Sequence, residues 1–176
     1  YVNYWLSVVA PELSEGTHYS VMMYGGRLLN SCSADIPGDD DDLIALFRVN
    51  THFCVLMDSD REKKGAQLNS TKLRIKKECE ASRNFSWVTD GRTIENYVPT
   101  EVLRYALDEL YPNKTYDWEL DEEYTCPLSG RFKGKTYGPD KIRVARKVAE
   151  LGHELSPELQ KHLNKLAKKI REANGM

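Results

Sequence analysis

Two short apolar runs in the middle of the chain predict neighbouring strands of one sheet. Residues 53–57 are five consecutive apolar residues, and residues 85–89 (Phe-Ser-Trp-Val-Thr) form a second run. An uninterrupted apolar run is typical of a strand that is covered on both faces. Helical patterns at residues 71–81 and 100–110 follow the two runs. This alternation predicts an α/β fold with a mostly parallel sheet flanked by helices.

Helical patterns also mark both ends of the chain. Apolar residues recur at helical spacing within residues 1–10, and basic helices are predicted at 140–151 and after Ser156. Ser156-Pro157-Glu158 is a typical helix start, with a capping residue, a proline at the first helical position and an acid in the first turn. No start signal precedes the first helix, so we expect this chain to be a fragment of a longer protein.

Three further elements are predicted between residues 18 and 47. Residues 18–24 are expected to form a buried strand before Gly25-Gly26, residues 27–34 a helix, and the acidic residues 39–42 the start of another helix. We divide the chain into a core at 1–111 and a helical, basic C-terminal extension at 112–176, both within one structural unit.

Composition narrows the class of protein. Of the 176 residues, 40% are apolar and 30% are charged, which excludes collagen, wholesale disorder and a disulfide mini-scaffold. The four cysteines are far apart and form no CxxC motif, which argues against zinc and favours free thiols in the reducing cytoplasm. No apolar run approaches the roughly 18 residues of a membrane span.

Charge is distributed unevenly along the chain. Residues 1–130 hold 13 basic and 22 acidic side chains, a net charge of −9, whereas residues 131–176 hold 12 and 5, a net charge of +7. One interpretation is a metal or acid/base site beside a surface that binds polyanions, and the other is a solvated basic helix on an acidic domain.

Asp58 and Asp60 are the sharpest chemical signal in the sequence. They follow the first apolar run directly, and residues two apart in a strand point to the same face. At the carboxyl end of a parallel strand, that face opens onto the crevice where α/β proteins bind ligands. Two carboxylates there suit Mg²⁺ or Mn²⁺, although Asp-Ser-Asp is also ordinary turn chemistry.

Weaker signals follow the second run and the Gly-Pro-Asp-Lys segment. Glu95 is placed to join the same acidic cluster, and Arg92 to hold a phosphate with its fork of donors. Lys141 is placed to stabilise charge on a phosphate or leaving oxygen. The basic residues after it suit contacts with a nucleic-acid backbone, namely Arg143, Arg146 and Lys147. Each of these residues has an alternative role in a surface salt bridge or on a solvated helix face.

The order of these motifs resembles the Toprim domain of OLD-family (overcoming lysogenization defect) nucleases. The resemblance rests on Gly25-Gly26, on Asp-Ser-Asp-Arg at 58–61 and on Arg-Thr-Ile-Glu-Asn-Tyr at 92–97. It covers residues 1–111 and extends towards Gly-Pro-Asp-Lys at 138–141. The resemblance implies a metal-dependent endonuclease that hydrolyses phosphodiester bonds in DNA.

Site roles follow from the resemblance residue by residue. Asp58 and Asp60 match the family's DxD metal ligands, and Glu95 matches an acidic ligand of a second metal. Arg92 matches a basic position near the scissile phosphate, and Lys141 matches the catalytic lysine. The implied cofactor is a pair of Mg²⁺ or Mn²⁺ ions. The implied partners are DNA, an ABC-type ATPase domain in the parent chain and further copies in a homo-oligomer, with a role in anti-phage defence.

One departure from the family keeps other functions open. The family's first strand ends in Glu-Gly with an Asp shortly after it, and these acidic residues are absent before the helix at 1–10. We therefore expect that the first strand is missing and that the fragment is weakly active. One alternative is a non-catalytic module for nucleic-acid binding or assembly with a degenerate acidic cluster. Another is a phosphotransfer domain in which Asp58 is the nucleophile.

Overall fold

The computed structural model shows a mixed α/β protein. It describes residues 1–23, 32–33, 44–45, 50–112, 117–118, 123–132 and 135–176. The described helices are α1 (Val2–Val9), α4 (Ser70–Ala81), α5 (Thr100–Leu110), α6 (Lys141–Leu151) and α7 (Pro157–Asn174), with the 3-10 helix η1 (Ile94–Tyr97). The described strands are β1 (Cys32–Ser33), β2 (Ile44–Ala45), β3 (Cys54–Met57), β4 (Phe85–Val88), β5 (Asp117–Trp118), β6 (Gly130–Phe132) and β7 (Lys135–Tyr137).

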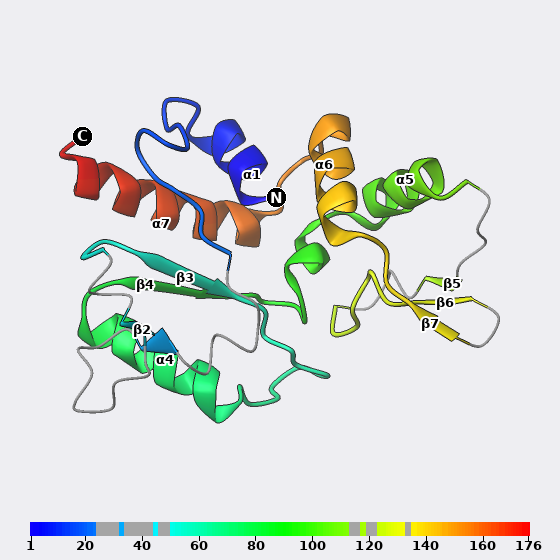
Figure 1. Ribbon diagram of the computed structural model, residues 1–176, viewed down its shortest axis with the longest axis horizontal. Coiled ribbons are helices and arrows are strands. Elements are labelled where there is room, and N and C mark those ends of the chain that lie inside the picture. The colour runs from blue at the N-terminus through cyan, green and yellow to red at the C-terminus, as the bar shows by residue number, and fades with distance from the viewer. Residues whose placement is uncertain (24–31, 34–43, 46–49, 113–116, 119–122, 133–134) are drawn as a thin grey trace.

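The parallel pair β3–β4 is the centre of the fold. Its register places Cys54 opposite Phe85 and Met57 opposite Val88, so both strands end at the same edge. Helix α4 covers one face of the pair, and α7 with α1 lies over the other (Figure 1). Both predicted strands, the parallel pairing and the cover on both faces are therefore confirmed.

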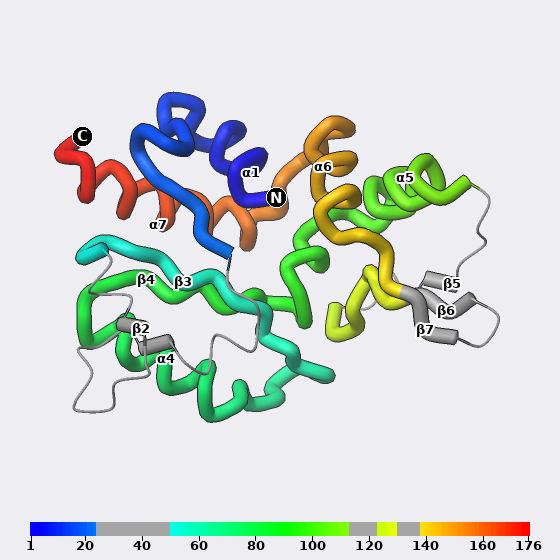
Figure 2. Tube along the Cα trace, in the orientation of Figure 1, coloured from blue at the N-terminus to red at the C-terminus, as the bar shows by residue number. Residues whose placement is uncertain are grey.

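The main core lies between the strand pair and the helices that contain the two chain ends. Trp5 of α1, Trp87 of β4 and Leu163 of α7 are fully buried in it. Burying a side chain of this kind contributes roughly 1.5–3 kcal/mol. Figure 2 shows that the first and last helices run side by side, and a smaller cluster between β3 and α4 contains Val55 and Ile75. Helix α7 thus shares one hydrophobic core with α1 and β4.

A hydrogen-bonded group of side chains joins the end of β4 to α7. We call Trp87, Asp90, Tyr97 and His162 the aromatic cluster. The Tyr97 hydroxyl donates to Asp90 Oδ2 at 2.8 Å and accepts from Trp87 Nε1 at 3.1 Å. His162 stacks on Trp87 with ring centroids 5.0 Å apart, and its Nε2 lies 3.0 Å from Asp90 Oδ2. Four residues from three elements are thereby held in one arrangement.

Several predictions for the first 50 residues are wrong where the structure describes them. Residues 18–23 form no strand: Tyr19 packs against the main core, but the residues after it lie outside any layer, and Met23 is 86% exposed. Cys32–Ser33 and Ile44–Ala45 pair as parallel strands where helices were predicted, since strand pairing satisfies their backbone groups. Tyr24, Gly25-Gly26 and residues 39–42 lie outside the described residues.

The predictions for the helices of the second half are confirmed within one or two residues. Helix α5 spans the predicted 100–110, α6 begins at Lys141, and the Ser156 hydroxyl accepts from Leu159 N–H at the start of α7. The helical extension also contains a small antiparallel sheet, β5–β6–β7, that was not predicted. Its strands are two or three residues long, too short to show alternation in the sequence.

Candidate functional site

A tight turn after β3 sends Asp58 and Asp60 to different partners. Asp58 Oδ1 accepts a hydrogen bond from Ile94 N–H at 2.8 Å, at the start of η1. Asp60 has a φ of 54°, a left-handed backbone that non-glycine residues adopt uncommonly, and its N–H donates to the Arg92 carbonyl at 3.0 Å. Asp60 Oδ2 forms an ion pair with Lys72 of α4. The two aspartates are therefore two residues apart in sequence but pair with different elements, Asp58 with η1 and Asp60 with α4.

The buried Ser59 between them ties the carboxyl ends of the two strands together. Its N–H donates to Thr89 Oγ1 at 2.8 Å, and its hydroxyl donates to the Gly91 carbonyl at 2.7 Å. Gly91 is required here, because a Cβ atom would lie 2.7 Å from Asn96 Cβ and 2.8 Å from the Glu123 carbonyl oxygen. These contacts fix the turn after β3 against the turn after β4.

Helix η1 places Glu95 at the carboxyl edge of the β3–β4 pair. Thr93 caps this short helix in a reciprocal arrangement with Asn96, whose side chain accepts from Thr93 N–H at 2.7 Å. The Glu95 side chain is only 2% exposed, and its Oε1 lies 3.2 Å from Lys141 Nζ. Its Oε2 is buried and has no hydrogen-bond partner among the described residues. A buried carboxylate oxygen without a donor is rare and calls for a functional explanation.

Lys141 reaches Glu95 from the first residue of α6. Asp140 caps that helix and accepts from the N–H groups of Ile142 and Arg143, so the start of α6 is fixed. We call Asp58, Glu95 and Lys141 the carboxylate site. Two strand-end turns and one helix start therefore contribute to it.

Electrostatics within the carboxylate site are coupled. Burial raises the pKa of Asp58, and the negative charges of Glu95 and Asp60 add to that effect against the opposing hydrogen bond from Ile94. Burial disfavours the charged form of Lys141, but the attraction of Glu95 outweighs it and holds the pKa of Lys141 above its ordinary value. Lys141 therefore stays charged at neutral pH, while the charged form of Asp58 is disfavoured relative to an exposed aspartate.

The other predicted site residues lie outside this group. Asp60 is paired with Lys72, and Arg92 Nη1 lies 3.8 Å from Glu62 Oε1. Among the residues that the structure describes, no group of three or more His, Cys, Asp or Glu side chains is arranged to hold a metal ion. Lys72 was not among the predicted site residues. Its spacing from Ile75 and Cys79 nevertheless places this lysine on the buried stripe of α4.

The predicted nucleic-acid contacts on α6 divide into two kinds. Arg143 and Arg146 are exposed on the helix surface. Lys147 instead forms ion pairs with Glu109 of α5 and, at 3.6 Å, with Glu150. Two of the three predicted positions thus face solvent, and Lys147 links α6 to α5.

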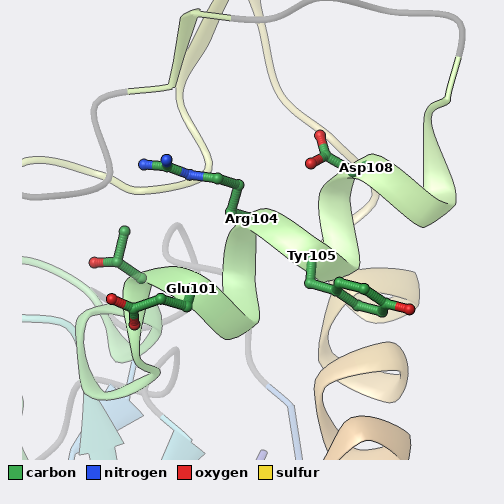
Figure 3. A pocket seen from close by; sticks show the side chains of 5 residues that line it. Glu101, Arg104, Tyr105 and Asp108 are labelled. Atoms are coloured by element: carbon green, nitrogen blue, oxygen red, sulfur yellow. The ribbon is translucent and has the colours of Figure 1, made fainter.

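A shallow pocket of about 250 Å³ lies along α5, away from the carboxylate site. Figure 3 shows Glu101, Arg104, Tyr105 and Asp108, which line it together with Thr100. All five lining residues belong to one helix, so the pocket is a groove on the exposed face of α5 and contains none of the predicted site residues.

Comparisons with known proteins leave the site to be interpreted from its geometry. No family model, no curated protein and no solved structure matches this chain. Within the described residues, no helix is long and apolar enough to cross a membrane.

Proposed function

We propose that the chain is a metal-dependent endonuclease module that hydrolyses phosphodiester bonds in DNA, of the kind its sequence resembles in OLD-type Toprim domains. The observation that carries the proposal is the carboxylate site at the shared carboxyl edge of a parallel strand pair. There Glu95 binds Lys141 at 3.2 Å, and Asp58 lies within electrostatic range of both. This edge is where α/β proteins bind their ligands.

The residues of the carboxylate site fit one divalent cation. Mg²⁺ in proteins takes one or two carboxylates and fills its remaining positions with water and phosphate oxygens, and Mn²⁺ prefers the same ligands. Asp58 and Glu95 supply two carboxylates, and the buried Glu95 Oε2 has no donor among the described residues. When bound, such a cation polarises the phosphate and favours ionisation of a bound water. Asp60 does not fit this role because Lys72 already neutralises it.

The cationic side chains supply the remaining functions from α6. Lys141 is about half exposed, so its ammonium group is accessible to a phosphate while Glu95 keeps it charged. A fixed positive charge there stabilises the negative charge that develops on a phosphate or leaving oxygen. Arg143 and Arg146, exposed on the same helix, would bind backbone phosphates without reading sequence.

The resemblance extends the proposal to the parent protein. We propose that the module belongs to a cytoplasmic, homo-oligomeric anti-phage nuclease with an ABC-type ATPase domain. One observation favours a second function, a non-catalytic module for nucleic-acid binding or assembly. The pairing of Asp60 with Lys72 takes a further carboxylate from the family's set, in addition to the Glu and Asp that are absent before residues 1–10.

Plasmid nicking tests the proposal directly. We expect the chain to nick supercoiled DNA weakly with Mg²⁺ or Mn²⁺ but not with Ca²⁺, which tolerates looser geometry. Asp58→Asn keeps an acceptor for Ile94 N–H, so it removes a ligand without unfolding the turn. Mutating a residue that only supports a metal ligand typically lowers activity roughly 10- to 100-fold. The cleavage rate of Asp58→Asn, which loses a ligand itself, should fall by more than that.

The matched control is Glu154→Gln, which neutralises an exposed carboxylate away from the site and should cleave like the wild type. Full cleavage by Asp58→Asn would overturn the assignment. DNA binding without cleavage under every metal would support the non-catalytic alternative.

A further inference from the structure

Lys72 is a buried lysine whose charged end meets Asp60. Its side chain is 7% exposed, whereas that of Asp60 is 60% exposed. A buried ammonium group needs a partner, because taking an unpaired charge out of water is expensive. The ion pair between Lys72 Nζ and Asp60 Oδ2 provides that partner.

Hydrogen bonds from backbone N–H groups fix both partners of the ion pair, Lys72 at the start of α4 and Asp60 in the turn after β3. Helix α4 starts beside the carboxyl end of β3, and Asn69 caps it by accepting from Lys72 N–H at 2.9 Å. Lys72 occupies the first position of the buried stripe that continues through Ile75 and Cys79, so its stem packs towards the strand pair. On the other side, the left-handed turn at Asp60 is held by the Arg92 carbonyl.

We infer that Lys72 is an internal counter-ion that takes the place of a second divalent cation at Asp60. The inference rests on the proposed function, which makes the carboxylate site a metal centre. It concerns the number of divalent cations that this site binds. A two-metal site needs carboxylates that bridge or surround both ions, and here the second carboxylate of the Asp-Ser-Asp turn is already paired with Lys72. The centre therefore binds a single divalent ion, through Asp58 and Glu95.

Mn²⁺ binding tests this inference without measuring cleavage. Titration of the full chain, followed by the electron paramagnetic resonance of free Mn²⁺, should give one bound ion per chain. Asp60→Asn should keep that stoichiometry and weaken binding by no more than about tenfold, because it leaves the Lys72 charge without its partner, whereas Asp58→Asn should lose binding. Two ions per chain in the wild type would overturn the inference. It would also be overturned if Asp60→Asn weakened Mn²⁺ binding as much as Asp58→Asn does.

Removing the counter-ion should have the opposite effect. Lys72→Met keeps the apolar stem and frees Asp60, so Mn²⁺ affinity should rise on the order of tenfold or more, since one more negative charge faces the ion. Adding Asp60→Asn to that variant should return the affinity to the wild-type level. The matched control is Lys77→Met, the same change at an exposed position of α4, which should leave Mn²⁺ binding unchanged.

These outcomes separate the inference from the proposed function. A wild type that binds no Mn²⁺ but gains an Asp60-dependent site in Lys72→Met would refute the proposed metal centre and still support the counter-ion. Lys72→Met with wild-type affinity would refute the counter-ion whatever the cleavage assay shows. If Lys72→Met fails to fold, as judged by circular dichroism, the Asp60→Asn comparison decides.

Discussion

The carboxylate site and the aromatic cluster both lie just beyond the carboxyl ends of β3 and β4, yet their hydrogen bonding differs. In the aromatic cluster, the Tyr97 hydroxyl accepts hydrogen bonds from Trp87 Nε1 and Asp90 N–H and donates one to Asp90 Oδ2. His162 Nε2 also lies within hydrogen-bond distance of Asp90 Oδ2. In the carboxylate site, Glu95 Oε2 is buried with no partner among the described residues. Among the described residues, the first group has no buried polar side-chain atom without a partner, whereas the second has one.

This contrast separates a structural group from a candidate functional one. A buried polar network in which every member is satisfied makes the core rigid and specific. A buried carboxylate with an unused oxygen costs free energy and has capacity for a ligand. The comparison therefore predicts that mutations in the aromatic cluster lower stability, whereas neutralising mutations in the carboxylate site spare stability and remove binding.

The largest effect on stability is expected from Trp87→Ala. Trp87 is fully buried between β4 and α7, where it stacks on His162, so the variant leaves a cavity and a broken network. Urea denaturation should show a loss of about 3–5 kcal/mol in the free energy of unfolding. Tyr105→Ala, which truncates an exposed aromatic residue of α5, should change it by less than about 0.5 kcal/mol. Equal losses in the two variants would contradict the structural role of the cluster.

The strand pair and the later helices could be predicted because local signals and tertiary packing agree there. The apolar run at 53–57 is covered on both faces, with Val55 and Met57 buried and the other residues half-buried, and Ser156-Pro157-Glu158 caps α7 as its sequence indicates. The predictions fail at Met23, where an apolar residue is exposed, and at Cys32 and Ile44, where strand pairing replaces the predicted helices. Apolar character alone does not tell which side of a segment another layer will cover.

The candidate site was predictable in its residue types but not in its pairings. The motif spacing selected Asp58, Glu95 and Lys141, which the structure brings together. It also selected Asp60, which the turn at φ 54° instead directs to Lys72. Period-two alternation applies only while the backbone is extended, and the strand has already ended at Met57.

A smaller effect is expected from Tyr97→Phe, which deletes one hydroxyl and keeps the ring. The change leaves the buried Trp87 N–H and the Asp90 N–H without their acceptor. Unsatisfied buried groups of this kind cost about 1–3 kcal/mol in the free energy of unfolding. Tyr105→Phe, at an exposed tyrosine, is the matched control and should be neutral. A neutral Tyr97→Phe would show that water or another residue satisfies the cluster.

The smallest effect, and the one that sharpens the comparison most, is the pH dependence of Asp58→Asn. The folded protein raises the pKa of Asp58 above its ordinary 3.8, chiefly through burial, so the folded state binds a proton more readily than the unfolded state. Stability from this group is therefore present at low pH and is lost as pH rises through the folded pKa. Asp58→Asn should match the wild type near pH 4 and be more stable at pH 7, in urea denaturation at a series of pH values. Glu154→Gln should show no such divergence, and an Asp58→Asn variant less stable than wild type at pH 7 would mean that the Ile94 hydrogen bond outweighs the cost of burial.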